Sequence, residues 1–305
     1  MAVGDLITAA RYNNAQGRVS AILGNGSGDE GYGQTVTSQQ VSSNVVINAT
    51  HVNAMFTDLN KIFVHQTGGV PNSIAEVEVG DSVAEDTSGG DTKEGFKDYE
   101  DFISIIETAG NRFRLASAQS STLNNAEVIQ RRNQWTAPIE CEFQVAFTDS
   151  DARRHFFNAG GSLTFISSLS NTPTAGDSVA KSQDWASILG NAGTVSMDYD
   201  VTTTSGSGVV QTIGNFDLTT SYQEIYRKSA TGVYGNNNYI LLAKAPTSST
   251  INIKYSFFDH NPGGFKIDEP VQGLLEAKIG FVRASGSFVD TPAPAFSAIN
   301  NLWHN

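Results

Sequence analysis

Two stripes of hydrophobic residues, at alternating spacings of three and four, open the chain. The first stripe consists of Tyr12, Ala15, Val19 and Ile22. The second consists of Val52, Met55, Leu59 and Ile62, and is widened by Phe56 and Phe63. Narrow stripes of this kind are typical of helices in short bundles and coiled coils. The sequence therefore predicts two amphipathic helices in the first seventy residues.

Both predicted helices carry start and stop signals. Thr8 and Asn48 precede them, and the side chains of these residues can accept a hydrogen bond from a free backbone N–H of the first turn. Gly24 and Gly68 follow them, and glycine is the commonest residue just after the end of a helix. The segment 25–40 between them is rich in Gly and Ser, so we expect a loop and a helical hairpin.

A two-helix hairpin by itself buries little apolar surface. We therefore expect its stripes to pack against identical subunits, most simply in a homotrimer, or against a neighbouring protein. The expected interface residues are Tyr12, Val19, Ile22, Val52, Met55, Phe56, Leu59, Ile62 and Phe63. The spacing does not distinguish three subunits from two or six. In the alternative, the hairpin packs against the β-domain of its own chain.

The pattern changes twice after the hairpin. Acidic residues and glycines between 70 and 95 predict a linker, and a helical stripe between Tyr99 and Phe113 predicts one further helix. From residue 124 onward, short segments alternate between apolar and polar residues and are separated by Gly, Asn and Pro, which is typical of strands.

The predicted fold class is α+β and mainly β. An N-terminal helical hairpin is followed by an antiparallel β-sandwich that resembles a jelly roll. The predicted division is a helical attachment and oligomerisation segment (1–70), an acidic linker with an amphipathic helix (71–123), the β-sandwich (124–290) and a Pro-punctuated tail (291–305). The apolar tip of this tail around Trp303 either docks onto a neighbour or is partly disordered.

Composition limits the classes of partner. The formal net charge is −12, which disfavours nucleic acid, because phosphate binding needs clustered Lys and Arg. Met1–Asp5 lack the features of a signal peptide, and no apolar run approaches the length of a membrane span. We therefore expect a protein that is made in a cytoplasm and does not insert into a membrane.

No catalytic residue, metal site or cofactor is predicted. The glycines of Gly26–Gly31 follow a predicted helix rather than a strand, so they do not indicate a dinucleotide site. The single cysteine, Cys141, lies in an alternating segment and is interpreted as a buried structural thiol. His65 could join a metal ring on a threefold axis, and Asp149 with Asp151 could bind Ca²⁺, although capping of the next helical turn is the preferred reading of Asp149.

One surface is a candidate for contact with a glycan. Tyr234 and Tyr239 flank Asn236, and rings beside amides can stack on a sugar and form hydrogen bonds to it. Core and turn positions are the competing interpretation for these tyrosines.

A structural turn is predicted in the segment 149–165. A short helical stretch is followed by a double glycine, which can reverse the chain before the next strand. The residues that define this turn are Arg154, His155, Phe156, Phe157, Asn158, Gly160 and Gly161.

This turn resembles a segment that recurs in virion structural proteins of tailed bacteriophages, especially those that infect cyanobacteria. Other short matches occur in the same order along the chain, at Met1–Asn13, His51–Leu59, Asn111–Arg114, Phe216–Thr220 and, with two departures, Val271–Leu274. The resemblance implies a non-enzymatic virion component that is assembled in the host cytoplasm with other virion proteins. The tail, baseplate or fibre region is the first expectation. A neck or collar position, a capsid-surface position, a module that binds host glycans and a glycan depolymerase are the alternatives.

Overall fold

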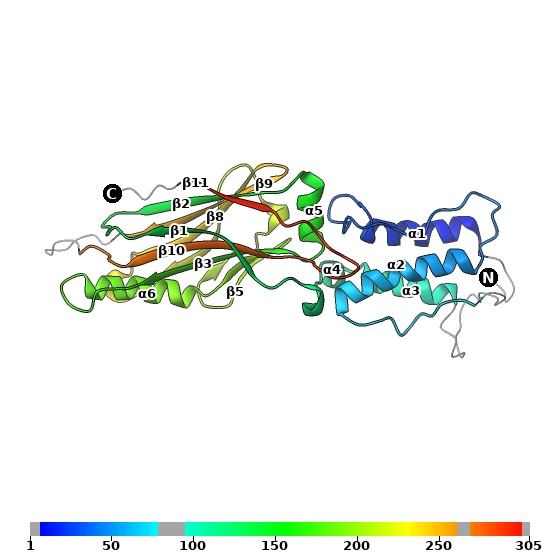
Figure 1. Ribbon diagram of the computed structural model, residues 1–305, viewed down its shortest axis with the longest axis horizontal. Coiled ribbons are helices and arrows are strands. Elements are labelled where there is room, and N and C mark those ends of the chain that lie inside the picture. The colour runs from blue at the N-terminus through cyan, green and yellow to red at the C-terminus, as the bar shows by residue number, and fades with distance from the viewer. Residues whose placement is uncertain (1–6, 79–94, 261–268, 301–305) are drawn as a thin grey trace. The chain divides into compact units, whose positions relative to one another are not determined.

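The computed structural model describes residues 7–78, 95–260 and 269–300. The fold is α+β and mainly β, with an N-terminal helical segment, which confirms the predicted fold class (Figure 1). The jelly-roll-like strand order stays a prediction. The chain divides into two units, which are called here the helical unit and the β-unit.

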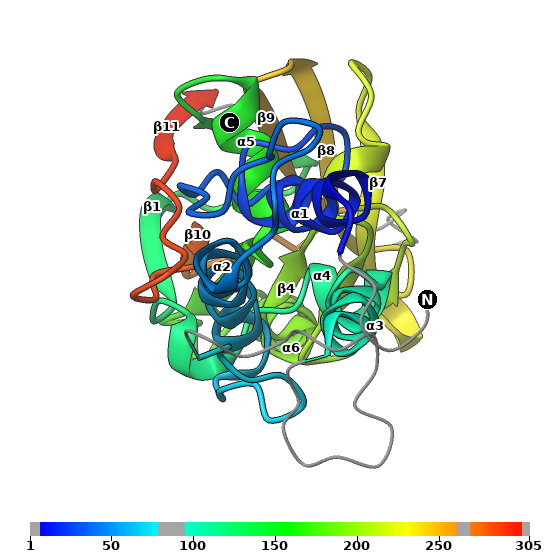
Figure 2. The same cartoon turned by 90° about the vertical axis from the view of Figure 1, so that its right-hand side faces the viewer.

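The helical unit contains residues from three parts of the chain, namely Met1–Ser121, Arg154–Gly161 and Arg283–Pro292. Its helices are α1 (Ala9–Leu23), α2 (Ala49–Thr67), α3 (Phe96–Ile106) and the short α4 (Ala109–Arg112). The first three helices pack against one another (Figure 2). The predicted caps are confirmed, since Thr8 accepts from the N–H of Arg11 and Asn48 from that of His51.

The hydrophobic stripes form the core of the helical unit. Seven of the nine predicted interface residues are at most 1% exposed, namely Tyr12, Val19, Ile22, Val52, Met55, Leu59 and Ile62. Phe56 and Phe63 are partly buried against the same core. The prediction that the stripes contact another subunit is therefore wrong for the seven buried residues, because they lie in a core that the hairpin shares with α3. For Phe56 and Phe63 it stays a prediction. The homotrimer was predicted from these stripes, so their burial within the chain removes the reason for predicting it.

Helix α3 also differs from its prediction. A single helix was expected between Tyr99 and Phe113, but α3 ends at Ile106 and α4 begins at Ala109. Thr108 between them has extended backbone, with φ −60° and ψ 145°, which interrupts the helix. Ile105, which was assigned to the stripe, is 52% exposed. The part of the predicted acidic linker at 79–94 lies outside the described residues.

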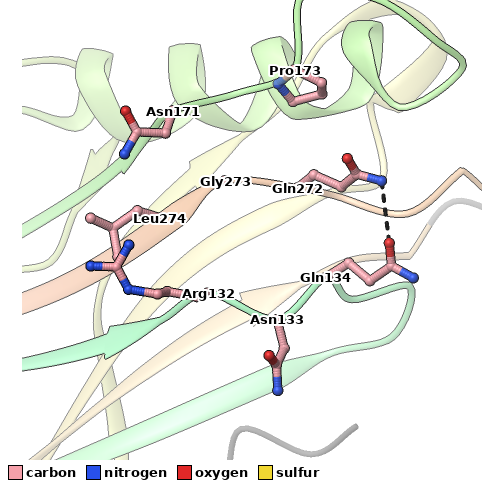
Figure 3. A pocket seen from close by; sticks show the side chains of 8 residues that line it. All are labelled: Arg132, Asn133, Gln134, Asn171, Pro173, Gln272, Gly273 and Leu274. Carbon is pink, nitrogen blue, oxygen red and sulfur yellow. Dashed lines mark hydrogen bonds between the residues drawn. The ribbon is translucent and has the colours of Figure 1, made fainter.

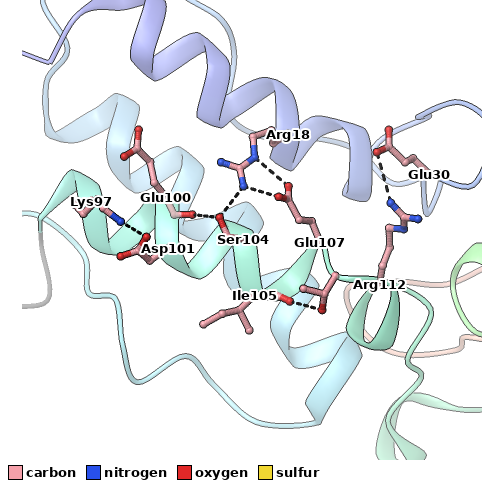
Figure 4. Close-up of polar contacts among 10 residues, drawn as sticks. Arg18, Glu30, Lys97, Glu100, Asp101, Ser104, Ile105, Glu107 and Arg112 are labelled. Atoms are coloured by element: carbon pink, nitrogen blue, oxygen red, sulfur yellow. Dashed lines mark hydrogen bonds and ion pairs between the residues drawn. The ribbon is translucent and has the colours of Figure 1, made fainter.

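Ion pairs join α1 to α3 along one side of the core. Arg18 Nη2 lies 2.6 Å from Glu107 Oε1 and donates to Ser104 Oγ at 2.9 Å (Figure 4). Arg11 Nη2 makes the corresponding contact with Glu100 Oε2 at 2.7 Å. Because these groups are partly exposed, we expect the ion pairs to fix the alignment of the two helices and to add little to the free energy of unfolding.

A buried carboxylate in α2 holds the loop that follows α1. Asp58 accepts hydrogen bonds from the backbone N–H groups of Thr37, at 3.0 and 2.9 Å, and Ser38, at 2.7 Å. Lys61 Nζ lies 2.9 Å from Oδ1 of Asp58. Burial raises the pKa of Asp58, but the backbone donors and Lys61 outweigh burial, so that the pKa lies below its usual value.

Asp58→Asn is expected to lower the free energy of unfolding of the helical unit by about 1–3 kcal/mol at neutral pH, since it removes a charged acceptor from buried donors. The contribution of the carboxylate is fully present above the unfolded pKa of about 4 and is lost as the pH falls through the lower folded pKa. Urea unfolding followed by circular dichroism measures this. The control Asp101→Asn removes a carboxylate that is 62% exposed and is paired with Lys97, and should change stability by about 0.5 kcal/mol or less.

The β-unit contains two antiparallel sheets. The first has the strand order β1 (Asn124–Arg131), β10 (Leu274–Val282), β3 (Ser162–Ser170), β4 (Val195–Met197) and β5 (Thr202–Thr204). The second has the order β11 (Ala295–Asn300), β2 (Ile139–Ala146), β9 (Thr250–Phe258), β8 (Asn238–Thr247), β7 (Gln223–Ser229) and β6 (Val209–Val210). Helix α6 (Val179–Ala192) packs on β3.

Alternation places the core of the β-unit between its sheets. Every second residue of β2 is buried, from Ile139 to Val145. The ring of Tyr255 in β9 lies 6.3 Å from that of Phe165 in β3, and its hydroxyl donates to the carbonyl of Lys278 in β10 at 2.6 Å. The sheets therefore face each other in a sandwich-like arrangement. Cys141 lies in this core, and burial raises the pKa of its thiol.

The observed division of the chain differs from the predicted one in three respects. Helix α3 shares a core with α1 and α2 instead of belonging to a separate linker. Ala159, Ala284 and Val289, from the region predicted to be β-sandwich, join that same core. Residues 295–300 of the predicted tail form β11, which pairs with β2, while Trp303 lies outside the described residues.

Candidate functional site

The predicted structural turn lies in helix α5 (Ser150–Asn158) and the glycines that follow it. Arg154 Nη1 donates to the carbonyls of Asn25 and Glu30, each at 2.6 Å, and His155 Nε2 lies 2.9 Å from the same Asn25 carbonyl. Gly33, with φ +72°, lies against the His155 ring so closely that a Cβ would come within 2.4 Å of Nδ1. These side chains therefore fasten the loop after α1 within the helical unit.

The rest of the turn is packed. Phe156 and Phe157 are fully buried with an edge-to-face contact at 5.0 Å, and Asn158 is fully buried beside them. Gly160 has φ +78°, whereas Gly161 is not among the glycines with positive φ. A Cβ on Gly161 would lie 2.5 Å from the Phe156 carbonyl, so this glycine serves close approach and not chain reversal.

The residues considered for glycan contact are not equally accessible. Tyr239 is 1% exposed, stacks on Phe257 at 5.4 Å and accepts a hydrogen bond from Ser167 at 3.0 Å. Its assignment to glycan contact is therefore wrong, because its position in β8 points into the core. Asn236 is exposed, and Tyr234 is half-buried with its hydroxyl 3.4 Å from Glu269.

The residues that were considered as metal ligands have structural roles instead. His65 is 1% exposed in the core of the helical unit, where its ring lies 4.8 Å from that of Tyr32, so it is not available to a ring of subunits. Asp149 accepts from the N–H of Ala152 at 2.7 Å, as expected for a helix cap. Within residues 7–78, 95–260 and 269–300, no group of three His, Cys, Asp or Glu side chains is arranged to hold a metal ion.

A pocket of about 600 Å³ lies at one end of the β-unit (Figure 3). Three chain segments form it where neighbouring strands of the first sheet begin or end. Its lining residues are Arg132, Asn133, Gln134, Asn171, Pro173, Gln272, Gly273 and Leu274. Because β10 runs antiparallel to both β1 and β3, the ends of β1 and β3 meet the start of β10 at the same edge.

Buried groups fix the backbone of this pocket. The guanidinium of Arg131, which is 3% exposed, donates to the carbonyls of Asn133, at 3.0 Å, and Gln134, at 3.1 Å. Trp135 and Val271 exchange backbone hydrogen bonds at 3.2 and 2.8 Å, which ties the segment after β1 to the segment before β10.

Further contacts hold the two sides of the pocket at fixed positions. The buried Ser182 in α6 accepts from the N–H of Gln272 at 2.9 Å, and Gln272 Nε2 donates to Gln134 Oε1 at 3.2 Å. Asn171 has φ +54°, which turns the chain away from β3. Gly273 has φ +145°, and a Cβ there would lie 2.6 Å from the Ser170 carbonyl. The amide side chains therefore project from a rigid frame.

The sequence pattern does not predict this pocket. Its residues flank strand ends and belong to no motif, and the antiparallel register that brings 132–134, 171–173 and 272–274 together joins segments far apart in sequence. The feature of the sequence that could have indicated the pocket is a group of Asn and Gln residues next to predicted strand termini.

A second hollow of about 440 Å³ lies on the helical unit and is lined in part by Arg18, Glu30 and Glu107. Its two carboxylates already have cationic partners, since Glu107 pairs with Arg18 and Glu30 lies 3.7 Å from Arg112 (Figure 4). We therefore regard the pocket of the β-unit as the better candidate for a ligand.

Comparisons with known proteins complete this description. No helix in the described part of the chain is both long and apolar enough to span a membrane. No protein-family model matches the chain, and comparisons with curated proteins and with solved structures likewise give no match.

Proposed function

We propose that this chain is a non-enzymatic structural component of a tailed-phage virion, located in the tail, baseplate or fibre region. The neck or collar and the capsid surface are the alternative positions. The proposal starts from the ordered series of short sequence matches to such proteins, of which the turn at 154–161 is the most informative.

The structural role of this turn is the observation that best supports the proposal. Arg154 and His155 bind backbone carbonyls of another loop, and Phe156, Phe157 and Asn158 are buried. Residues that serve packing in this way fit a protein selected for its shape and assembly. They do not supply a nucleophile, an acid or a base.

The rival function of a glycan depolymerase requires two carboxylates that face each other across a cleft. Among the described residues, those that line the pocket of the β-unit include one arginine and several amides but neither Asp nor Glu. The attachment role of the helical unit is retained in the proposal, but it must use exposed residues, because the stripe residues are buried.

Immunogold electron microscopy tests the proposal. Antibody raised against the recombinant chain should label purified particles of the tailed phage whose genome encodes it, at the tail or baseplate. Labelling at the neck or capsid would support a virion role and move its position. Absence of the chain from purified particles, by labelling and by mass spectrometry, would contradict the proposal.

A further inference from the structure

We infer that the pocket of the β-unit is a binding site for an acidic sugar, that is, a pyranose unit that carries one carboxylate. This inference concerns the chemistry of the pocket and holds whether or not the chain is a virion component. The pocket volume of about 600 Å³ lies within the range of roughly 300–1,000 Å³ that is common for small-molecule sites.

The polar lining is suited to hydroxyl groups. Asn133, Gln134, Asn171 and Gln272 each carry a carboxamide, which offers donors and an acceptor in one planar group. A sugar hydroxyl donates and accepts, so that neighbouring hydroxyls match neighbouring amides. The hydrogen bond between Gln272 and Gln134 fixes the orientation of two of these groups and leaves one N–H and the oxygen of Gln272, and both N–H groups of Gln134, for a ligand.

The charge of the lining selects for an anion. Arg132 is exposed, and none of the described residues forms an ion pair with it, although the chain as a whole carries a net charge of −12. A guanidinium can bind a carboxylate through two parallel hydrogen bonds, which gives orientation as well as attraction. A single cation among amides therefore favours one carboxylate on a polyhydroxylated ring.

The acidic side chain on β10, Glu276, does not neutralise the positive charge that Arg132 offers to an anion. Glu276 lies two residues beyond Leu274, on the same face of the strand. Its carboxylate pairs with Lys278 Nζ at 2.9 Å and accepts a hydrogen bond from Gln130 Nε2 at 2.6 Å. The hydrogen bond from Lys278 is the main reason why the pKa of Glu276 lies below its usual value, so that this carboxylate stays charged and paired.

The frame of the pocket lowers the entropic cost of binding. Its backbone is fixed by Arg131, by the bridge between Trp135 and Val271 and by Ser182, so few groups must be ordered when a ligand arrives. The exposed positions of Arg132, Asn133 and Asn171 leave the pocket open at its rim. It is therefore shaped to take one unit of a longer polysaccharide as well as a free sugar acid.

Ligand-observed NMR and isothermal titration with D-glucuronate, D-glucose and acetate test the inference on the full chain. We expect glucuronate to bind at least about tenfold more tightly than glucose or acetate, since a charged hydrogen-bond pair and the hydroxyl contacts both contribute. An oligosaccharide of glucuronate should bind as well as the monomer or better, which distinguishes a polysaccharide unit from a free sugar acid.

Two variants locate the binding. Arg132→Gln keeps N–H donors and removes the charge, and should weaken glucuronate binding about tenfold or more without changing the affinity for glucose. Asn171→Gly removes an amide and preserves the positive φ, and should weaken both sugars. Lys228→Gln, at a half-buried site on β7 that is not part of the pocket lining, is the control and should leave both affinities unchanged, and the melting temperature of each variant shows that it is folded.

Three outcomes would overturn the inference. They are no binding of glucuronate at millimolar concentration, binding no tighter than that of acetate, and equal affinity for glucuronate in Arg132→Gln and in the natural chain.

Discussion

Lys181→Met is expected to lower the free energy of unfolding of the β-unit by about 3–5 kcal/mol, because it leaves a buried carboxylate without its cation. Lys181 in α6 and Asp259, which follows β9, are both fully buried, and Nζ lies 2.8 Å from Oδ2. The pair fastens α6 to the second sheet. Asp259→Leu is expected to lower the free energy of unfolding by a similar amount, since it leaves the buried ammonium group of Lys181 without the carboxylate of Asp259.

The double variant Lys181→Met/Asp259→Leu separates the cost of an unpaired charge from the value of the pair. Replacement of both partners by apolar residues is expected to recover most of the loss, because the desolvation of two charges is removed together. Tryptophan fluorescence during urea unfolding measures the effect, since Trp135 and Trp185 lie in the β-unit. The control is Lys228→Met, which removes a half-buried lysine whose Nζ donates a solvent-exposed hydrogen bond to Ser207 at 2.9 Å, and it should have little effect. A double variant as unstable as either single one would contradict this account.

The helical unit is expected to lose about 2 kcal/mol of stability between roughly pH 7 and roughly pH 5 through His65 alone. Burial is the main cause that lowers the pKa of His65 to about 4, and the nearby backbone of Ala159 offsets part of this effect. The unfolded chain has a histidine pKa near 6.5, so it binds the proton first as the pH falls. Stability is thus fully present above about pH 6.5 and is lost as the pH falls toward 4.

His65→Leu should remove most of this pH dependence, because the leucine binds no proton in either state. Urea unfolding followed by circular dichroism at the two pH values measures the change. The matched control is Ile62→Val, one turn away in α2, which should cost about 0.5–1.5 kcal/mol at both pH values and keep the natural dependence. Equal pH dependence in His65→Leu and the natural chain would show that other groups cause it.

For deletion of residues 1–70, the structure leads to a different expected result from the sequence pattern. The change of period near residues 70–125 suggests that the β-region would fold alone after loss of the hairpin. In the structure, Tyr99, Phe102 and Ile103 of α3 are buried in the same core as the hairpin. We therefore expect such a truncated chain to expose this face of α3 and to aggregate, unless α3 is removed as well.

Local signals in the sequence determined the secondary structure well where each element carries its own pattern. The caps of α1 and α2 and the alternation of β2 depend on residues close together in the chain, and they agree with the structure. The break between α3 and α4 was missed, because the apolar spacing continues across Thr108 while its backbone is extended. Strand β11 was missed because Pro292 and Pro294, just before it, mark its segment as a tail.

Tertiary structure alone decided what the apolar residues contact and where a ligand could bind. Spacing shows that Val52 and Leu59 share a helix face, but it does not show whether that face meets a second subunit or α3. The pocket depends on antiparallel register, which places Arg132, Asn171 and Gln272 at one edge although they are far apart in sequence. The physical reason is that local propensity acts over a few residues, whereas burial and register depend on the whole folded chain.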